Sequence, residues 1–240
     1  MQKQIIIKTK DKKNNIYGVL DYKTKKDKLI IFVHGLTGHK NEHQFYNAAK
    51  YFTAKGFNVF RFDLYSGEKG GRKLDDCTID IHVEDLNEVI RYFLVKYKKI
   101  YLVGHSLGGP VILRANLKPI TKIVLWDPSV NLAKEDEDEQ WYYFNKKINA
   151  YIASWGTSYL LNKKLVEEWN KLDYRQWYKN CNIPLKVICA GGGILKNTWK
   201  KIIKNFKPVN KLIIIKGATH TFDEAGVEEI LFKETLVWFK

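Results

Sequence analysis

Cysteine and long hydrophobic runs are scarce in this sequence of 240 residues. The three cysteines, Cys77, Cys181 and Cys189, are odd in number and lack the spacing of a metal site, which predicts reduced thiols in a cytosol. No stretch approaches the roughly 18 uninterrupted apolar residues of a transmembrane helix. The apolar run Ile5–Ile7 near the start is too short for a signal peptide and is typical of a strand. We therefore expect a cytoplasmic protein without a transmembrane segment.

Acidic residues are also under-represented, because 26 Asp and Glu stand against 41 Lys and Arg, a net charge of +15. Such a basic balance is compatible with binding to nucleic acid or to an anionic membrane. However, most of the basic residues are lysines spread over the whole chain, and no RNA-recognition, helix-turn-helix or zinc-finger signature accompanies them. We expect a solvated, lysine-rich surface and no specific nucleic-acid partner.

Strand-like and helix-like segments alternate along the chain, without an internal repeat. The expected strands lie at residues 5–7, 15–22, 29–33, 57–62, 99–103, 123–126 and 211–215, with a seventh strand and its turn within 184–194, and the clearest helices at 44–55, 80–96 and 111–117. This alternation predicts an α/β fold with a mostly parallel eight-stranded sheet and helices on both faces. Ligands of such sheets bind at the carboxyl ends of the strands.

The segment of residues 128–182 interrupts this alternation between the sixth and seventh strands. We predict that it is a helical cap inserted into an α/β core formed by residues 1–127 and 183–240. Most of its aromatic residues are expected to pack the cap, and about a third to face substrate. They are Trp141, Tyr142, Tyr143, Phe144, Tyr151, Trp155, Tyr159, Trp169, Tyr174, Trp177 and Tyr178. The acidic run at 135–139 is expected to be a solvated entrance to the cap.

The segment Gly104–Gly108 has the pattern G-x-S-x-G and lies between a strand-like and a helix-like run. In this context the pattern predicts a sharp, strained turn that presents Ser106 to solvent as a nucleophile. Backbone N–H groups at the start of the following helix favour an anion beside it. An ordinary serine in a glycine-rich turn is the alternative.

A second motif, His34–Gly38, directly follows the strand at 29–33. An acyl-transfer serine needs two backbone N–H donors for the oxyanion, one from the residue after the nucleophile and one from the loop after the third strand. Leu107 and Leu36 occupy these two positions. We expect His34 to anchor the loop by hydrogen bonds rather than to act as a catalytic base.

His220 lies in a loop just after the last expected strand, 211–215. The chain order, serine first and then histidine after the final strand, is that of the α/β hydrolases and differs from those of chymotrypsin and subtilisin. Neutral imidazole is a suitable base near pH 7. We predict that His220 accepts the proton of Ser106.

These motifs resemble those of the α/β-hydrolase superfamily, in particular small bacterial cinnamoyl and feruloyl esterases and the serine aminopeptidase-like and monoacylglycerol-lipase-like group. The resemblance covers nearly the whole chain and includes Arg61–Leu64 after the fourth strand and Asp85–Ile90 before the serine motif. It implies the α/β-hydrolase fold and serine chemistry. The substrate stays open, because this fold hosts many activities.

The acid of the expected triad departs from the family pattern. The resemblance places the usual aspartate at about Gly193, and the segment 184–194 contains no carboxylate. The best replacement is Asp127, directly after the sixth strand, because some lipases of this fold carry their acid on that neighbouring strand. There it would orient His220 and stabilise the imidazolium. A structural role for Asp127 as the cap of an Asp-Pro turn is the alternative.

The predicted function is a serine hydrolase that cleaves a small-molecule carboxylic ester, or a thioester, through an acyl-enzyme. Ser106, His220 and Asp127 would form its triad, and no metal or organic cofactor is implied. The empty acid position at Gly193 leaves open a catalytically degenerate hydrolase that only binds a ligand. The same triad would also serve a peptide or amide hydrolase.

Overall fold

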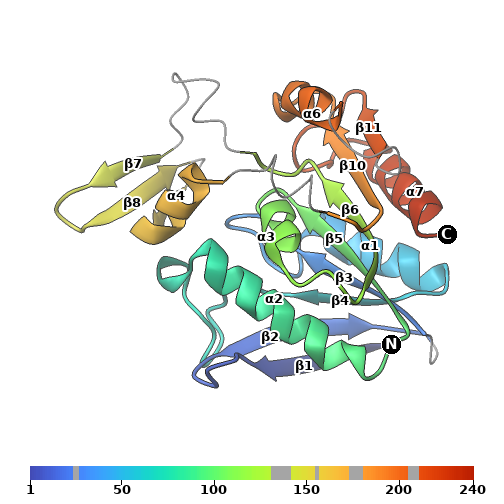
Figure 1. Ribbon diagram of the computed structural model, residues 1–240, viewed down its shortest axis with the longest axis horizontal. Coiled ribbons are helices and arrows are strands. Elements are labelled where there is room, and N and C mark those ends of the chain that lie inside the picture. The colour runs from blue at the N-terminus through green and yellow to red at the C-terminus, as the bar shows by residue number, and fades with distance from the viewer. Residues whose placement is uncertain (24–26, 131–141, 155–156, 173–180, 205–210) are drawn as a thin grey trace.

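One sheet of eight strands runs through the molecule in a computed structural model, which describes residues 1–23, 27–130, 142–154, 157–172, 181–204 and 211–240 (Figure 1). Its strands are β1 (Gln2–Lys8), β2 (Asn15–Asp21), β3 (Lys28–Val33), β4 (Asn58–Phe62), β5 (Lys99–His105), β6 (Ile120–Trp126), β10 (Leu185–Ala190) and β11 (Lys211–Ile215). Their order in the sheet is β1-β2-β4-β3-β5-β6-β10-β11. β2 pairs antiparallel with β1 and β4, and the remaining neighbours pair in parallel. The predicted eight-stranded, mostly parallel sheet is therefore confirmed.

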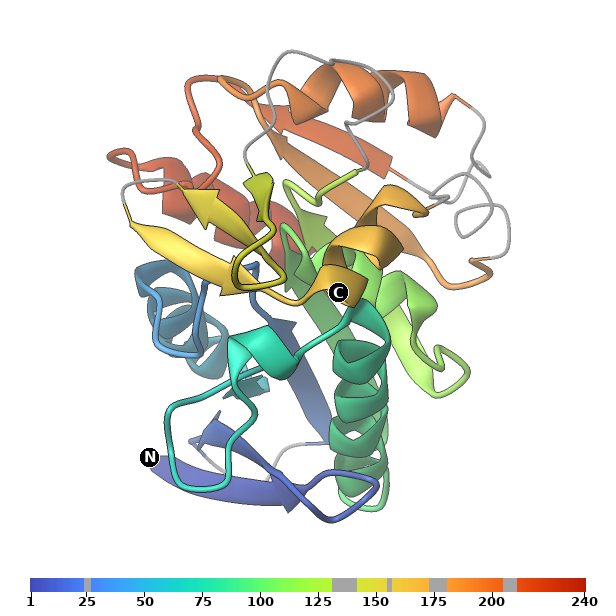
Figure 2. The same ribbon diagram turned by 90° about the vertical axis from the view of Figure 1, so that its left-hand side faces the viewer.

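Helices cover both faces of this sheet (Figures 1 and 2). One face carries α2 (Ile79–Leu94), α3 (Gly108–Arg114) and α6 (Leu195–Ile203), and the other carries α1 (His43–Ala54) and α7 (Val227–Phe239). A short 3-10 helix, η1 (Leu74–Asp76), precedes α2. α2 begins where the Thr78 side chain accepts a hydrogen bond from the Ile81 N–H at 3.2 Å, which satisfies one of the unpaired donors of its first turn.

The central strands are apolar over their whole length because both of their faces are covered. In β3, the side chains of Leu29 and Ile31 pack in the core under α2 and α3, whereas those of Ile30 and Phe32 pack under α1 and α7. Successive side chains of a strand point to opposite faces, so a strand with helices on both sides needs hydrophobic residues at every position.

The described residues between β6 and β10 form a second, small sheet, so the prediction of a helical cap is wrong for most of them. The small sheet consists of β7 (Tyr142–Asn145), β8 (Ala150–Ser154) and β9 (Ser158–Leu161), paired antiparallel, and the helix α4 (Lys163–Asn170) follows it. Aromatic and β-branched side chains favour strands. The abundance of aromatic residues in this segment, which we attributed to packing between helices, indicates strands here.

The inner face of the small sheet points toward the main body of the molecule. Tyr142, Ala153 and Leu161 form a small core with Leu165 of α4, and the partly buried Leu36 of the main domain packs against it. The insertion therefore lies over the loop that follows β3. Its expected boundaries at residues 128 and 182 stay a prediction. The acidic run at 135–139 and five of the expected aromatic residues lie outside the described residues; these are Trp141, Trp155, Tyr174, Trp177 and Tyr178.

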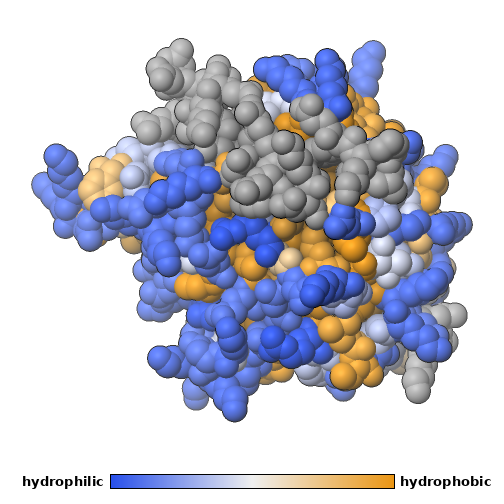
Figure 3. Space-filling view, viewed as in Figure 1, coloured by the Kyte–Doolittle hydropathy of each residue, from blue (hydrophilic) through white to orange (hydrophobic). Residues whose placement is uncertain are grey.

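Hydrophilic residues dominate the face of the molecule shown in Figure 3, and the apolar residues on it gather along a strip through its middle. None of the helices in the described part of the chain combines the length and the apolar character that a membrane span requires. The three cysteines are buried and carry free thiols.

Candidate active site

Ser106 stands at the turn between β5 and α3, in the conformation that the G-x-S-x-G pattern predicts. Its backbone φ is +51°, in the left-handed region that residues other than glycine rarely adopt. The turn is so tight that a Cβ atom at Gly104 would lie 2.6 Å from the Gly108 carbonyl oxygen, and one at Gly108 would lie 2.2 Å from the Val33 carbonyl oxygen. Only glycine fits at these two positions, and the turn between them projects Ser106 away from the sheet.

Asp127 and His220 meet at the carboxyl ends of their strands. Asp127 follows β6 and is completely buried, and His220 follows β11 with 45% of its side chain exposed. The distance from His220 Nδ1 to Asp127 Oδ2 is 2.6 Å. The other carboxylate oxygen accepts a hydrogen bond from the Ala190 N–H at 3.1 Å. Both oxygens of the Asp127 carboxylate thus bind partners outside the Asp-Pro turn. The alternative expectation was that Asp127 caps this turn.

Gly193, the position of the usual acid by family resemblance, lies beside this carboxylate. A Cβ atom built at Gly193 would be 3.7 Å from Asp127 Oδ2. A side chain at residue 193 and the side chain of Asp127 therefore reach the same point from two neighbouring strands. Asp127 occupies the space that an aspartate at 193 would fill.

The hydroxyl of Ser106 is hydrogen-bonded to a second serine, which the sequence analysis did not single out. Ser106 Oγ lies 3.0 Å from Ser129 Oγ, and the Ser129 N–H donates to the Ser106 carbonyl oxygen at 3.1 Å. Ser106 and His220 form no hydrogen bond with each other. Ser129 stands two residues after Asp127, and this position is the only sequence signal that could have drawn attention to it. In unliganded enzymes catalytic hydrogen bonds often form only in the complex with substrate.

Leu36 and Leu107, the predicted oxyanion donors, belong to two segments that meet at Ser106. Leu107 directly follows Ser106, and a Cβ atom at Gly35 would lie only 2.9 Å from the Cβ of Ser106. Within the described ranges, neither the Leu36 N–H nor the Leu107 N–H donates a hydrogen bond to another residue. Two unengaged backbone donors thus lie beside Ser106, as an oxyanion hole requires.

His34 anchors the loop after β3, as expected. Its Nε2 accepts a hydrogen bond from the Leu64 N–H at 2.9 Å, which leaves the proton on Nδ1 for the Gly35 carbonyl oxygen at 2.7 Å. Burial lowers the pKa of His34 to about 4, so the ring is neutral near pH 7. A buried, neutral and doubly bonded ring is a structural anchor.

A second buried histidine, His105, holds the loop that carries His220. Its Nε2 lies 2.8 Å from the backbone carbonyl oxygen of His220, and its Nδ1 lies 3.2 Å from Nε2 of Gln44 on α1. Burial lowers the pKa of His105 to about 3, so the ring is neutral and donates one proton to the carbonyl oxygen. No role for His105 follows from the sequence, since a residue at the variable position of the motif gives no signal by itself.

Among the described residues, His, Cys, Asp and Glu side chains form no group of three or more that could hold a metal ion. Cys189 lies on β10 near Asp127, and burial followed by the Asp127 charge raises the pKa of its thiol. A protonated, buried thiol is a poor nucleophile.

Comparisons with known proteins agree with the fold. A family model described as alpha/beta hydrolase fold matches residues 28–182. No match was found among curated protein sequences. The chain is similar to a structure of Est1E from Butyrivibrio proteoclasticus with bound ferulic acid, with 20% identity, a TM-score of 0.82, and coverage of 98% of this chain and 99% of that one.

Two further solved structures have comparable similarity. The alpha/beta hydrolase GrgF from a Penicillium species has 17% identity and a TM-score of 0.79, with coverage of 100% of this chain and 98% of that one. Alpha/beta hydrolase domain-containing protein 10 from mouse has 15% identity and a TM-score of 0.79, with coverage of 99% and 98%. At such low identity, these likenesses show the fold and not the substrate.

Proposed function

This chain belongs to the α/β-hydrolase family, and we propose that it is a serine hydrolase that cleaves carboxylic esters through an acyl-enzyme intermediate. The observation that carries the proposal is the 2.6 Å contact between His220 Nδ1 and Asp127 Oδ2, at the sheet edge where Ser106 stands. In the proposal Ser106 is the nucleophile, His220 the general base and Asp127 the acid that orients the base.

The first half-reaction depends on which ring nitrogen of His220 contacts Asp127 and which is left to accept a proton. Because Nδ1 of His220 faces Asp127, the other ring nitrogen, Nε2, accepts the proton of Ser106. The Ser106 Oγ then bonds to the carbonyl carbon, and the carbonyl oxygen becomes an oxyanion that the N–H groups of Leu36 and Leu107 stabilise. When the tetrahedral intermediate collapses, the bond to the leaving oxygen breaks, and that oxygen takes the proton from His220.

The second half-reaction repeats these steps with water. His220 Nε2 removes a proton from the water, whose oxygen bonds to the acyl carbon. The bond to Ser106 Oγ then breaks, Ser106 regains its proton, and the carboxylic acid leaves. A thioester would follow the same steps with a thiol as leaving group, so thioesters fall within the proposed class.

The Ser106–Ser129 hydrogen bond requires one adjustment before the first step. The Ser106 hydroxyl has to rotate about its Cα–Cβ bond from Ser129 toward His220, a rotamer change that is fast in partly exposed residues. Substrate binding beside Ser106 would favour the rotated state. In this mechanism the Ser106–Ser129 hydrogen bond is therefore that of the resting enzyme.

The two alternatives are a binding-only protein and a peptide or amide hydrolase. The first was motivated by the absence of a carboxylate at Gly193, and the Asp127–His220 contact argues against it. The second uses the same triad, and no feature of the described residues favours an amide over an ester. The free thiols of the three cysteines support a reducing compartment, and we include a cytosolic location in the proposal.

The test is hydrolysis of p-nitrophenyl and aryl esters with acyl chains from acetate to long-chain, measured for the unmodified protein and for Ser106→Ala. Methyl ferulate is included because a similar structure binds ferulic acid. We expect turnover and covalent fluorophosphonate labelling in the unmodified protein, and neither in Ser106→Ala. Ser158→Ala, a change on the exposed strand β9, is the matched control and should keep both.

Three results would contradict the proposal. Fluorophosphonate labelling of another residue in Ser106→Ala would overturn the assignment of the nucleophile. A folded protein that neither turns over any ester nor reacts with the fluorophosphonate would favour the binding-only alternative. Hydrolysis of aryl amides at rates above those of the matching esters would favour the amide hydrolase.

A further inference from the structure

The peptide unit between Gly35 and Leu36 contains both an anchored carbonyl and the predicted oxyanion donor. A trans peptide is planar, so the direction of the Gly35 carbonyl sets the opposite direction of the Leu36 N–H. Two side chains approach that carbonyl oxygen: His34 Nδ1 at 2.7 Å and the Tyr65 hydroxyl at 3.5 Å. Groups that hold the Gly35 carbonyl therefore also aim the Leu36 N–H.

The Tyr65 hydroxyl contacts the loop on both sides of Leu36. It donates to the Gly35 carbonyl oxygen at 3.5 Å, a long and weak hydrogen bond, and the backbone of Thr37 lies beside it. Burial raises the pKa of Tyr65 well above its usual value, so the hydroxyl keeps its proton and remains a donor. One side chain thus lies beside both peptide units that flank Leu36.

Thr37 shows why this loop needs support. Its φ is +62°, in the left-handed region, which is unfavourable for a β-branched residue. Such a conformation is strained and persists only where neighbouring groups hold it. The Tyr65 side chain, beside the Thr37 backbone, is one such neighbour.

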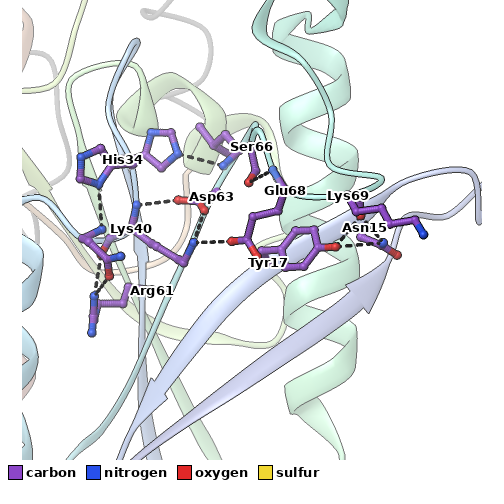
Figure 4. Close-up of polar contacts among 12 residues, drawn as sticks. Asn15, Tyr17, His34, Lys40, Arg61, Asp63, Ser66, Glu68 and Lys69 are labelled. Atoms are coloured by element: carbon purple, nitrogen blue, oxygen red, sulfur yellow. Dashed lines mark hydrogen bonds and ion pairs between the residues drawn. The ribbon is translucent and has the colours of Figure 1, made fainter.

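Tyr65 is itself held in a rigid frame, because the segment after β4 is bonded to the loop after β3 at several points (Figure 4). The Leu64 N–H donates to His34 Nε2 at 2.9 Å. The Lys40 N–H donates to Asp63 Oδ1 at 2.7 Å, and Arg61 donates to the Lys40 carbonyl oxygen at 2.9 Å. These contacts fix the backbone on which Tyr65 stands relative to the loop that it supports.

We propose that Tyr65 is a positioning residue of the oxyanion hole, whose hydroxyl holds the segment Gly35–Thr37 so that the Leu36 N–H points at the developing oxyanion. The inference rests on the proposed function of this site. Tyr65 acts through the loop and not on the substrate. Loss of its hydroxyl should therefore reduce the stabilisation of the transition state more than the binding of the substrate.

The test is Tyr65→Phe, which removes the hydroxyl and keeps the ring that packs against His34. We expect kcat for the best ester to fall by about tenfold, with KM nearly unchanged, because the loss of one hydrogen bond leaves the Leu36 N–H less well aligned with the oxyanion. The inhibition constant of an aryl trifluoromethyl ketone should rise by a similar factor. That compound bonds to the nucleophile and forms an oxyanion in the same place.

Tyr97→Phe is the matched control. The Tyr97 hydroxyl accepts a hydrogen bond from Asn58 Nδ2 at 3.0 Å, so this change also removes a hydrogen-bonded phenol. Tyr97 follows α2, and its partner Asn58 starts β4, at the opposite end of that strand from the loop that carries Tyr65. We expect kcat, KM and the affinity for the ketone to stay as in the unmodified protein.

A second measurement separates this inference from the proposed function. Amide hydrogen exchange over residues 33–41, measured without substrate, should be faster in Tyr65→Phe and unchanged in Tyr97→Phe. Unchanged exchange overturns the inference, whether or not the protein is active. Faster exchange in an active enzyme with unchanged kcat and ketone affinity also overturns it. If even the unmodified protein shows no turnover and no fluorophosphonate labelling, the proposed function fails, and the role in the oxyanion hole fails with it.

Discussion

The Oγ atoms of Ser106 and Ser129 lie 3.0 Å apart, so the candidate nucleophile is hydrogen-bonded to a second serine and not to the candidate base. Ser129 is firmly held. Its N–H donates to the Ser106 carbonyl oxygen at 3.1 Å, and Trp199 Nε1 donates to the carbonyl oxygen of the preceding Pro128 at 2.9 Å. In the resting state Ser129 therefore competes with His220 for the Ser106 hydroxyl.

Removal of the Ser129 hydroxyl should release Ser106 toward His220. One neutral hydrogen bond is worth about 1 kcal/mol, so we expect Ser129→Ala to raise the rate of fluorophosphonate labelling by about fivefold. The measurement is the second-order rate constant of labelling, compared with that of the unmodified protein. A fall of two orders of magnitude or more would show instead that Ser129 takes part in the reaction.

Asp127→Asn should lower kcat by several orders of magnitude and leave the melting temperature nearly unchanged. The amide keeps the size of the side chain but cannot hold His220 in the tautomer that leaves Nε2 free, a change that costs about 10⁴-fold in the serine proteases. Ester turnover and thermal melting are measured together. Asp223→Asn, an exposed carboxylate three residues after His220, is the control and should keep its activity. A drop in melting temperature at full activity would mean that Asp127 only stabilises its turn.

The acid should be transferable to residue 193. Since a Cβ atom at Gly193 would lie 3.7 Å from Asp127 Oδ2 and meets no closer neighbour, an aspartate fits there. We expect the double change Asp127→Ala with Gly193→Asp to recover part of the activity that Asp127→Ala loses. Gly193→Asn in the same background is the control and should recover none. Equal activity of the two double variants would argue against a triad acid at this point.

His105 should matter for kcat through the position of His220. His105→Phe keeps a ring in the buried site but cannot donate to the His220 carbonyl oxygen, a hydrogen bond of 2.8 Å. We expect kcat to fall by about tenfold, with KM unchanged. Gln44→Met removes only the outer contact of His105 and should have a smaller effect. An effect of His105→Phe on KM alone would exclude this positioning role.

His82 should make the protein less stable in acid. It is fully buried on α2, neither ring nitrogen has a hydrogen-bond partner among the described residues, and burial lowers its pKa to about 3. Between an unfolded pKa of about 6.5 and this value, the unfolded chain binds a proton that the folded protein excludes. Stability is therefore lost as the pH falls through this window.

The variant His82→Leu tests this directly. It removes the titrating group and an unpaired buried polar side chain, so it should be at least as stable at pH 7 and should lose less stability on acidification to pH 4.5. Thermal melting at a series of pH values gives the slope of the melting temperature against pH. His39→Leu, a change of an exposed histidine, should keep the slope of the unmodified protein. An unaltered slope in His82→Leu would contradict the prediction.

The sequence predicted the main sheet well because its signals are local. Runs such as residues 29–33 are apolar at every position, which is what a strand covered on both faces requires, and the structure places this run in the buried strand β3. Helix ends were less accurate: the helix expected at 111–117 is α3, which spans Gly108–Arg114. The insertion was predicted wrongly, since aromatic residues suit both helix packing and the strands that they form here.

The sequence by itself determined the turn at Ser106, because the glycine at 104 is required by a contact with Gly108, four positions away, and the pattern can be recognised in any strand-to-helix context. The glycine at 108 is also required by the Val33 carbonyl oxygen, a contact that only the tertiary structure creates. Only the tertiary structure decided which carboxylate meets His220. Asp127 lies 93 residues before it, and the two side chains come together because β6, β10 and β11 are neighbours in the sheet. The partner of the Ser106 hydroxyl was decided in the same way, since a distance between side chains depends on packing that no local pattern encodes.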